Sequence, residues 1–470
     1  MMFTRSFRRQ TEDNLNVNWK RFYYQVCLLV IPMALQNLIN VGVTAADVVM
    51  LGRVGEKVLS GASLAGQIQF IMTLILFGTT SGATVLTAQY WGKKDTRTIE
   101  KIMGMGMTIG VSCAFLFTLA AELMPEVLMR IYSSDPEVIA EGVKYLRIVA
   151  ISYLFMAGTQ VYLNIMRSIE RVMIATAVYS ISLVTNIVIN GVLIFGLMGF
   201  PKLGIIGAAV GTLISRITEF GIVVWYASVK NKVVRFHFKD LWKIDRVLFR
   251  DFMVYATPVI LNELMWGLGS SANTAVMGHL GSAAVASNSV AQVARQLATV
   301  VVFGVSNATA IYLGKTIGEK NFELAKAYGK RFVWLSLITG GLGGGVILIA
   351  APIANRFMTL SPEAQGYLTF MFFVMSYFTL CQALNTTLVV GVFRSGGDTR
   401  FGLALDVSTM WGCSILIGAL AAFVFHASVP VVYIILMSDE VIKVPITVKR
   451  FLSYKWIKDV TRERTELASE

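Results

Sequence analysis

The chain has 470 residues, of which 55% are hydrophobic and 15% are charged, and its mean hydropathy is +0.65. This composition is too apolar and too poor in charge for a soluble protein of this size, so it indicates a polytopic membrane protein. The net charge of +13 does not indicate a nucleic-acid partner, because the basic residues are spread over many short connections instead of one patch. Membrane lipids explain the charge better.

Apolar stretches of roughly 20 residues or more, long enough to cross a bilayer, recur along the whole chain. We therefore expect an all-α polytopic membrane protein with about twelve transmembrane helices in two pseudo-symmetric six-helix lobes. The expected spans lie near 25–50, 58–89, 102–125, 145–166, 172–198, 203–228, 251–277, 283–313, 332–355, 365–392, 401–425 and 428–447.

The two lobes are predicted from an internal repeat. Residues 47–95 match residues 273–321 without a gap, at a shift of 226 positions. The matched pairs include Gly52 and Gly278, Gly78 and Gly304, Lys94 and Lys320, and, further upstream, Pro32 and Pro258. A duplicated helix bundle is the usual construction of a secondary transporter. Functional residues are therefore sought where one copy has an ionisable group and the other does not.

Charge also predicts the orientation and the domain boundaries. Most Lys and Arg residues fall in alternate connections, which places these connections and both termini in the cytoplasm. The basic stretch between the copies is interpreted as an amphipathic linker helix on the membrane surface, and the C-terminal tail has similar charge and aromatic content. The expected domains are an N-terminal lobe at 1–228, the linker at 229–250, a C-terminal lobe at 251–447 and a basic cytoplasmic tail at 448–470.

Asp47 is the most informative carboxylate within a span. A charge at mid-membrane depth costs roughly 2.5–3.5 kcal/mol, so it needs a partner or a function. Asp47 ends the first span, and its equivalent in the second copy is the neutral Asn273. Either residue can serve a structural hydrogen bond, whereas binding of a cation or a proton needs the acid. We interpret Asp47 as an ion-coupling residue, with a capping or packing role near a helix end as the alternative.

Two amides of the fifth span, Asn186 and Asn190, are four residues apart and so lie on one face of a helix. They can provide carbonyl ligands for a hard cation or hydrogen bonds for a carboxyl group. Amide contacts between helices explain them equally well on the sequence alone.

The second copy has an acid and a base that the first copy lacks. Glu263 corresponds to Asn37, and Arg295 corresponds to Gln69. One interpretation is a Glu263–Arg295 ion pair, and the other is an acid in a central cavity that meets a cationic substrate or protons. Aromatic residues such as Trp266 suit a cavity for flat lipophilic ligands. The candidate residues of the substrate cavity are therefore Glu263, Arg295, Asn37 and Trp266.

The remaining charges within the spans are interpreted mainly as structural, because they can pair at helical spacings. These residues are Arg216 with Glu219 in span six, Asp406 in span eleven, and Asp439, Glu440 and Lys443 in span twelve.

The sequence does not predict an enzyme. The four cysteines lie in apolar spans without CxxC spacing, and the three histidines are scattered over loops on both faces. This arrangement predicts no disulfide, no metal cluster and no catalytic nucleophile. The one metal ion that we consider is Na⁺ at Asp47, and no cofactor is expected apart from a coupling ion, H⁺ or Na⁺.

Several motifs jointly resemble the MATE family, the multidrug and toxic compound extrusion transporters, over about residues 20–455. They are ADVVMLGRVG at 46–55, FGTTSGATVLTAQYWG at 77–92, NIVINGVLIFG at 186–196, GIIGAAVGT at 204–212, ASNSVAQVARQ at 286–296 and FRSGGDTRFG at 393–402. The resemblance implies two six-helix lobes around a central cavity and efflux driven by inward Na⁺ or H⁺.

The resemblance also implies site residues. A cation-binding acid in the first helix matches Asp47, and its partners in helices five and six match Asn186, Asn190 and Thr212. The chain departs from the archaeal and DinF-like branch, in which a second aspartate stands at the place of Asn190. The implied first-lobe site therefore has one carboxylate.

A second departure concerns the other lobe. The NorM-like branch has an aspartate in helix ten at about Ala383, and this chain lacks it. The helix-seven glutamate of that branch lies two to three residues beyond Glu263. These differences speak against a NorM-type Na⁺ site in the second lobe.

The sequence as a whole predicts an antiporter of the cytoplasmic (inner) membrane that exports cationic or amphipathic organic compounds in exchange for H⁺ or Na⁺. The expected partners are a small organic substrate and membrane lipids, and the chain is expected to be a monomer. The alternative is a flippase for a lipid-linked oligosaccharide or cell-wall precursor. Such proteins use several basic residues to bind pyrophosphate, whereas the spans here contain few, among them Arg147, Arg216 and Arg295.

Overall fold

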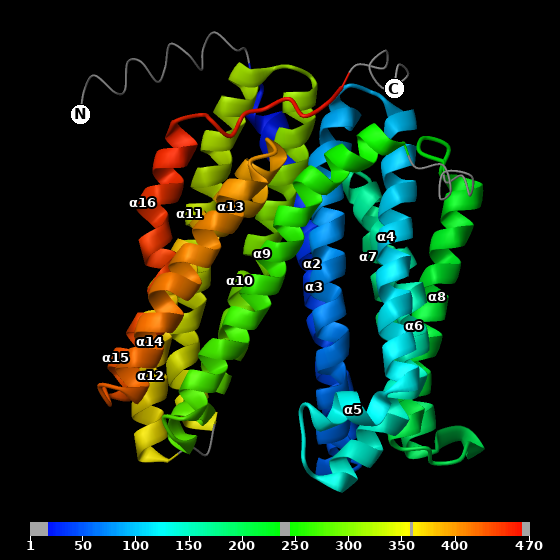
Figure 1. Cartoon of the computed structure of the whole chain (residues 1–470), viewed down its shortest axis with the longest axis vertical. Coiled ribbons are helices and arrows are strands. Elements are labelled where there is room, and N and C mark those ends of the chain that lie inside the picture. The colour runs from blue at the N-terminus through cyan, green and yellow to red at the C-terminus, as the bar shows by residue number, and fades with distance from the viewer. Residues whose placement is uncertain (1–16, 236–244, 358–360, 463–470) are drawn as a thin grey trace. The chain divides into compact units, whose positions relative to one another are not determined.

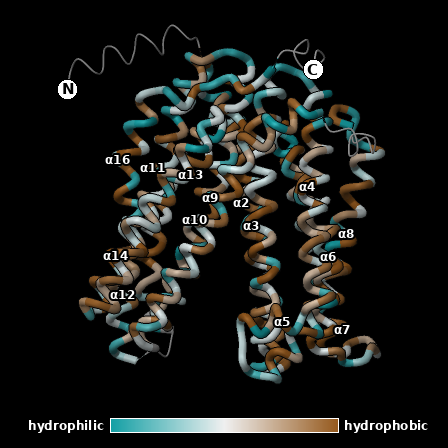
Figure 2. Tube along the Cα trace, in the orientation of Figure 1, coloured by the Kyte–Doolittle hydropathy of each residue, from teal (hydrophilic) through white to brown (hydrophobic). Residues whose placement is uncertain are grey.

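The structure is a computed structural model that describes residues 17–235, 245–357 and 361–462. These residues form helices joined by short connections, and no strand occurs among them (Figure 1). Hydrophobic residues run along most of the helix lengths, and hydrophilic residues gather at many of the helix ends (Figure 2). The predicted all-α membrane fold is thus confirmed.

The first half of the chain begins with the two longest helices of that half, and short turns connect most of its elements. Its elements are α2 (Trp19–Gly52), α3 (Glu56–Gly92), α4 (Thr96–Leu123), α5 (Pro125–Arg130), α6 (Pro136–Ser168), α7 (Met173–Phe195), η1 (Leu197–Gly199), α8 (Ile205–Trp225) and the π-helical η2 (Tyr226–Lys230). Local sequence sets several helix starts. Asp95 accepts a hydrogen bond from the Thr98 amide, and Asp135, followed by Pro136, accepts one from the Glu137 amide.

The second half has longer irregular segments within its helices. Its elements are α9 (Arg246–Gly278), α10 (Ser282–Gly318), α11 (Phe322–Phe357), α12 (Pro362–Thr386) with the π-helical η4 (Thr387–Phe393), α13 (Thr399–Asp406) with the π-helical η5 (Val407–Ile415), α14 (Leu416–Phe423), α15 (Val429–Leu436) and α16 (Asp439–Leu452). Ser361 caps α12 by accepting a hydrogen bond from the Ala364 amide.

Ten helices of the described chain are long and apolar enough to cross a membrane. The other two expected spans, 251–277 and 428–447, lie in α9 and in the pair α15 and α16. The 428–447 span is not one continuous helix, because the chain leaves helical geometry between Leu436 and Asp439. With these two elements the expected number of about twelve spans fits the structure.

The internal repeat is visible in the backbone. The equivalent helices α3 and α10 both have 37 residues. Each is followed by a lysine with a positive φ of 59°, Lys94 in the first copy and Lys320 in the second. Equivalent glycines also allow close helix crossings. A methyl group on Gly78 would lie 2.5 Å from Ile260 Cα, and one on Gly304 would lie 3.2 Å from the Val30 carbonyl oxygen.

The chain divides into two compact units. The N-terminal unit contains Leu35–Thr87, Lys94–Gly267 and Arg462, and the C-terminal unit contains the first part of α2 through Ala34, then Ala88–Lys93 and Leu268–Thr461. Helices α2, α3 and α9 therefore contribute to both units. The lobe boundaries at 228 and 251 remain a prediction.

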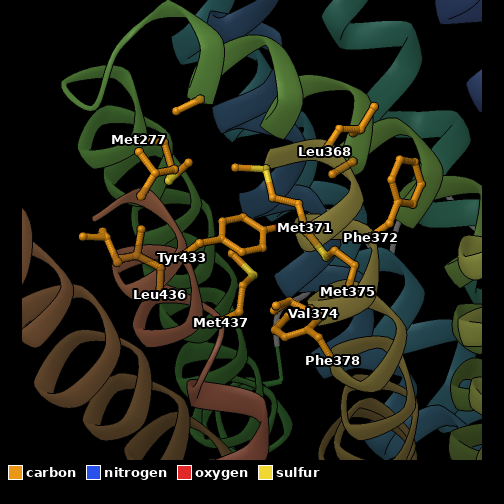
Figure 3. Close-up of a cluster of buried hydrophobic side chains, with 14 of the residues drawn as sticks. Met277, Leu368, Met371, Phe372, Val374, Met375, Phe378, Tyr433, Leu436 and Met437 are labelled. Atoms are coloured by element: carbon orange, nitrogen blue, oxygen red, sulfur yellow. The ribbon is translucent and has the colours of Figure 1, made fainter. Parts of the chain in front are cut away.

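Each unit has its own hydrophobic core. In the N-terminal unit the core includes Met72, Leu76 and Tyr153. In the C-terminal unit α12 supplies Met371, Phe372, Val374, Met375 and Phe378, which pack with Tyr433 and Leu436 of α15 (Figure 3). Tight packing of this kind holds the polar side chains described below in fixed positions.

The predicted linker helix is only partly described. Residues 231–235 are not helical, and residues 236–244 lie outside the described chain. The described residues on either side of 236–244 contact the start of α4. The Arg235 amide donates to Glu100 Oε1 at 2.7 Å, and Lys101 pairs with Asp245 at 3.1 Å.

The tail differs from the predicted surface element. Helix α16 ends at Leu452, and the chain then continues without regular helix to residue 462, while residues 463–470 lie outside the described chain. Trp456 is fully buried and stacks on Phe451. Gln89 donates to the Lys458 carbonyl and accepts from the Val460 amide. The tail aromatics pack within the protein because Gln89 and its neighbours offer hydrogen bonds to the tail backbone.

Candidate ion-coupling site

The site lies in the N-terminal unit, where α2, α7 and α8 bring polar side chains together. Asn190 Nδ2 donates a hydrogen bond to Asp47 Oδ1 at 2.6 Å and another to Asn186 Oδ1 at 3.2 Å. Asn186 and Asn190 are buried, and Asp47 is partly buried. The four-residue spacing on α7 thus places both amides beside the acid, as the sequence suggested.

An ion pair on α8, between the partly buried Arg216 and the buried Glu219, lies next to this acid–amide group. Arg216 Nη1 contacts Glu219 Oε1 at 2.8 Å and Oε2 at 3.0 Å, and Ser182 Oγ donates to Glu219 Oε1 at 2.5 Å. Arg216 also attracts Asp47 electrostatically. One base therefore faces two acids, which leaves one negative charge in excess when all three groups are ionised. A coupling cation would balance it.

The acid, the Asn186 amide and the ion pair line a cavity of about 490 Å³. Its lining includes Asp47, Asn186, Thr212, Arg216 and Glu219, together with polar and aromatic residues from α2, α3, α6, α7 and α8. A volume of this size lies within the range of small-molecule sites, roughly 300–1,000 Å³. The cavity therefore has room for a small solute beside Asp47.

Within the described chain, the buried Asn190 Oδ1 has no hydrogen-bond partner, and Thr212 places its hydroxyl group at the cavity wall. Hard cations bind carboxylate, carbonyl and hydroxyl oxygens. The donor set of Asp47, Asn186, Asn190 and Thr212 therefore fits a cation or a proton on the acid, and the structure brings all four predicted coupling residues into one unit.

Gly211 explains how Asn190 fits into the crossing of α7 and α8. A methyl group on Gly211 would lie 1.9 Å from Asn190 Oδ1. A residue without a side chain is needed here, because any Cβ would displace the amide that holds Asp47.

The four candidates for the substrate cavity do not lie at this site. Asn37, Glu263 and Trp266 belong to the N-terminal unit, and they are not among the residues that line the cavity. Arg295 belongs to the C-terminal unit, where its Nε donates to Gln292 Oε1 at 2.8 Å. The Glu263–Arg295 pair, like the cavity role of the four residues, stays a prediction.

Sequence reasoning missed several cavity residues. Ser182 lies four residues before Asn186, so the polar face of α7 extends one turn further than the two amides. Arg216 and Glu219 pair at the predicted spacing, but they also line the cavity below Thr212 on the same face of α8. The helical spacing of these residues from Asn186 on α7 and from Thr212 on α8 could have predicted their place at the cavity.

A family model provides the deciding comparison. The MatE model matches residues 32–192 and again residues 258–420, and the starts of the two matches are separated by the same 226 positions as the internal repeat. The chain belongs to the MatE family. The resemblance to the MATE transporters is thereby confirmed, and the duplication within the chain is that of the family model.

Known bacterial members are similar over most of their length. The chain is 22% identical over 393 residues to the probable multidrug resistance protein YoeA of Bacillus subtilis, covering 83% of this chain and 84% of that protein. It is 24% identical over 415 residues to the probable multidrug resistance protein NorM of Agrobacterium fabrum, covering 86% and 88%.

Solved structures share the fold of this MatE member. One, described as the outward-facing conformation of a multidrug resistance MATE family transporter of the MOP superfamily, matches with a TM-score of 0.82 at 18% identity. The match covers 92% of this chain and 96% of that structure. Similarity at this level of identity establishes the fold alone.

Proposed function

We propose that this MatE protein is an antiporter that exports cationic or amphipathic organic compounds in exchange for H⁺ or Na⁺. The observation that carries the proposal is Asp47, a partly buried carboxylate held by Asn190 at the wall of a 490 Å³ cavity. An acid at such a place attracts a cationic solute and a small coupling ion alike, so the two compete for it. The names of the relatives, which describe multidrug resistance proteins, agree with this proposal.

The cavity does not favour the flippase alternative. Among the residues that line it, Arg216 is the one Lys or Arg, and its guanidinium pairs with Glu219. A pyrophosphate group needs several free basic donors. The net negative charge of the group favours a cation.

The proposed location is the cytoplasmic membrane, with both termini in the cytoplasm. The distribution of basic residues supports this orientation. Outward export would then move substrate from the cytoplasm against its gradient, and the inward movement of H⁺ or Na⁺ would drive it.

The proposal is tested by efflux of ethidium from proteoliposomes with an imposed pH gradient or an imposed Na⁺ gradient. We expect one of the two gradients to drive efflux in the wild type, and Asp47→Asn to abolish it. Glu363→Gln is the matched control, because Glu363 is an exposed acid at the end of α12 that accepts from Tyr367. Efflux by Asp47→Asn at the wild-type rate would contradict the proposal.

A further inference from the structure

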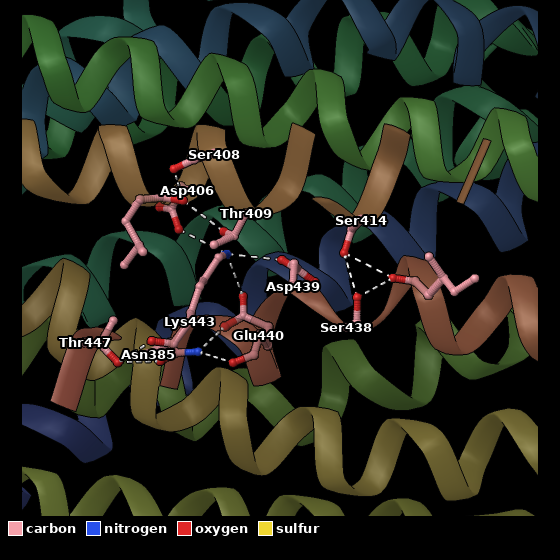
Figure 4. Close-up of polar contacts among 12 residues, drawn as sticks. Asn385, Asp406, Ser408, Thr409, Ser414, Ser438, Asp439, Glu440, Lys443 and Thr447 are labelled. Carbon is pink, nitrogen blue, oxygen red and sulfur yellow. Dashed lines mark hydrogen bonds and ion pairs between the residues drawn. The ribbon is translucent and has the colours of Figure 1, made fainter. Parts of the chain in front are cut away.

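The C-terminal unit contains a buried charge network outside the ion-coupling site. Lys443 Nζ lies 3.0 Å from Asp406 Oδ1, 3.1 Å from Asp439 Oδ2 and 3.3 Å from Glu440 Oε1 (Figure 4). The side chain of Lys443 is 3% exposed. An ammonium group has three N–H donors, so the three carboxylates use all of them. The predicted local pair of Glu440 and Lys443 forms, and Asp406 joins it from another helix.

The charges of this network do not balance. Arg295 of α10 interacts electrostatically with Asp439 and Glu440. With Lys443 it makes two positive charges against three carboxylates, so one negative charge remains when all groups are ionised. An uncompensated charge in a buried site is costly, and such a group usually takes up a proton instead.

The neighbours of Glu440 supply no further cation. Helix α16 packs against α12, η4 and η5. No Lys, Arg or His occurs in these three elements. The other titratable groups near this region include the Cys381 thiol of α12, near Glu440, the Tyr433 hydroxyl of α15, near Arg295, and the Tyr377 hydroxyl of α12, near Cys381 and Tyr433. All three are neutral donors or acceptors at ordinary pH.

Glu440 is the carboxylate best placed to hold the missing proton. It has the longest of the three contacts to Lys443, at 3.3 Å, and its other oxygen accepts from the neutral Asn385 amide at 2.7 Å. Asn385 is fixed in this orientation, because its Oδ1 accepts from Thr447 Oγ1 at 2.9 Å and its Nδ2 also donates to the Glu440 carbonyl. The amide adds no charge, so it does not replace the missing cation beside Glu440.

Helix α12 carries unpartnered polar groups on the face that holds Asn385. Gln382 lies one turn before Asn385, and Thr379 lies one turn before Gln382. Both are buried, and neither Gln382 Oε1 nor Thr379 Oγ1 has a hydrogen-bond partner among the residues that the structure describes. Gln382 Oε1 is an acceptor without a donor, and a protonated carboxyl group is a donor that needs an acceptor.

Regular helix geometry ends at the network in three elements. The π-helical η4 begins two residues after Asn385, η5 begins directly after Asp406, and α16 begins at Asp439 after a break. Segments of this kind release backbone groups from the α-helical pattern and occur frequently at functional sites. Asp406 and Asp439 lie at two of these places, and Asn385, which binds Glu440, lies at the third.

We propose that Glu440 is a second proton site of this transporter, in the C-terminal unit and separate from Asp47. The proton comes from the aqueous medium, binds one Glu440 oxygen and neutralises the network of Asp406, Asp439, Lys443 and Arg295. When it leaves, it returns to the medium and the network regains its negative charge. The consequence for transport, a second proton carried in each cycle, rests on the proposed antiport.

The proton is observed directly by infrared spectroscopy of the purified full-length protein. The experiment uses the Asp47→Asn variant, so that the first site is already neutral and a failure of the proposed antiport does not affect the result. We expect a protonated carboxyl C=O band at neutral pH, where exposed glutamates with pKa values of about 4.3 are ionised. The band should shift when the protein is labelled with ¹³C-glutamate, and it should disappear when the pH is raised further.

Two variants assign the band to this residue. In Asp47→Asn/Glu440→Gln the band is lost, whereas in Asp47→Asn/Glu363→Gln it remains at full intensity. The labelling experiment needs no substitution in the network, so it decides the question even if Glu440→Gln fails to fold. The absence of any labelled protonated glutamate band at neutral pH, or an equal band with and without Glu440, would overturn the proposal.

Discussion

The two units each contain a charge network around one base, Arg216 of α8 in the N-terminal unit and Lys443 of α16 in the C-terminal unit, and the networks differ in how open they are. In the N-terminal unit Asp47, Arg216 and Glu219 line a cavity of about 490 Å³. In the C-terminal unit three carboxylates contact Lys443 directly, and its side chain is 3% exposed. The repeat shift of 226 places Arg216 at position 442, beside Lys443.

The difference shows that two copies of one helix bundle can place their charged residues in different surroundings. The open network has room for a solute and an ion at the same acid, whereas the closed network has its acids bonded to a fixed ammonium. A closed network exchanges a proton without admitting a larger ion. The following four predictions test this comparison.

Lys443→Met should have the largest effect, and it acts on stability. The change leaves the buried Asp439 and Glu440 and the partly buried Asp406 without their shared cation, and breaking a buried pair in this way costs roughly 3–5 kcal/mol. Arg216→Met should cost less, because its acids face a cavity that water can enter. The free energies of unfolding in detergent measure both. Equal losses would show that openness does not separate the networks, and Lys443→Met/Glu440→Gln should recover part of the loss.

Gly211→Ala should weaken ion coupling without changing any polar group. The added methyl group would meet Asn190 Oδ1 and move the amide away from Asp47. We expect the concentration of coupling ion at half-maximal efflux to rise about tenfold, equivalent to about 1.4 kcal/mol. Gly191→Ala on α7 is the matched control, since a methyl group there meets no atom within 4 Å. The same shift in both variants would refute this role of Gly211.

An exposed ion pair provides the contrast to the buried Lys443. Lys57 Nζ lies 2.9 Å from Asp135 Oδ2, with the two side chains 50% and 40% exposed. The hydrogen bond from Lys57 lowers the pKa of Asp135 below its ordinary value of 3.8. Because the folded-state pKa is the lower one, the stabilisation is present above pH 3.8 and is lost as the pH falls through the folded value.

Asp135→Asn should therefore change the unfolding temperature slightly at neutral pH and remove this part of the acid dependence. Thermal unfolding of wild type and variant, measured at neutral pH and well below pH 3.8, tests it. A loss as large as that of Lys443→Met would contradict the assumption that exposure weakens an ion pair.

Asn273→Asp should have no effect on coupling, although it recreates Asp47 at the equivalent position. The amides Asn186 and Asn190 belong to the fifth span, and the corresponding span of the second copy, at 399–423, contains no Asn or Gln, so the new acid has no amide partners from it. We expect Asp47→Asn/Asn273→Asp to remain without ion-driven efflux in proteoliposomes. Restored efflux would show that the acid alone makes the site.

The sequence predicted the parts of the site that follow from helical spacing. Asn186 and Asn190 were placed on one face four residues apart, and the structure has them beside Asp47. Spacing along one helix does not reveal contacts between helices, so Asp406 was not assigned to Lys443. The tail shows the same limit, because the buried position of Trp456 depends on packing against residues remote in sequence.

The central claim is that Asp47 links ion binding to substrate binding. The direct test measures the affinity of the purified protein for tetraphenylphosphonium, a lipophilic organic cation, while pH and Na⁺ concentration are varied independently. By linkage, a coupling ion that competes with substrate weakens substrate affinity by the same factor as substrate weakens ion affinity. The wild type should lose affinity as one ion increases, and Asp47→Asn should show no dependence on that ion. The same ion dependence in both proteins would contradict the claim.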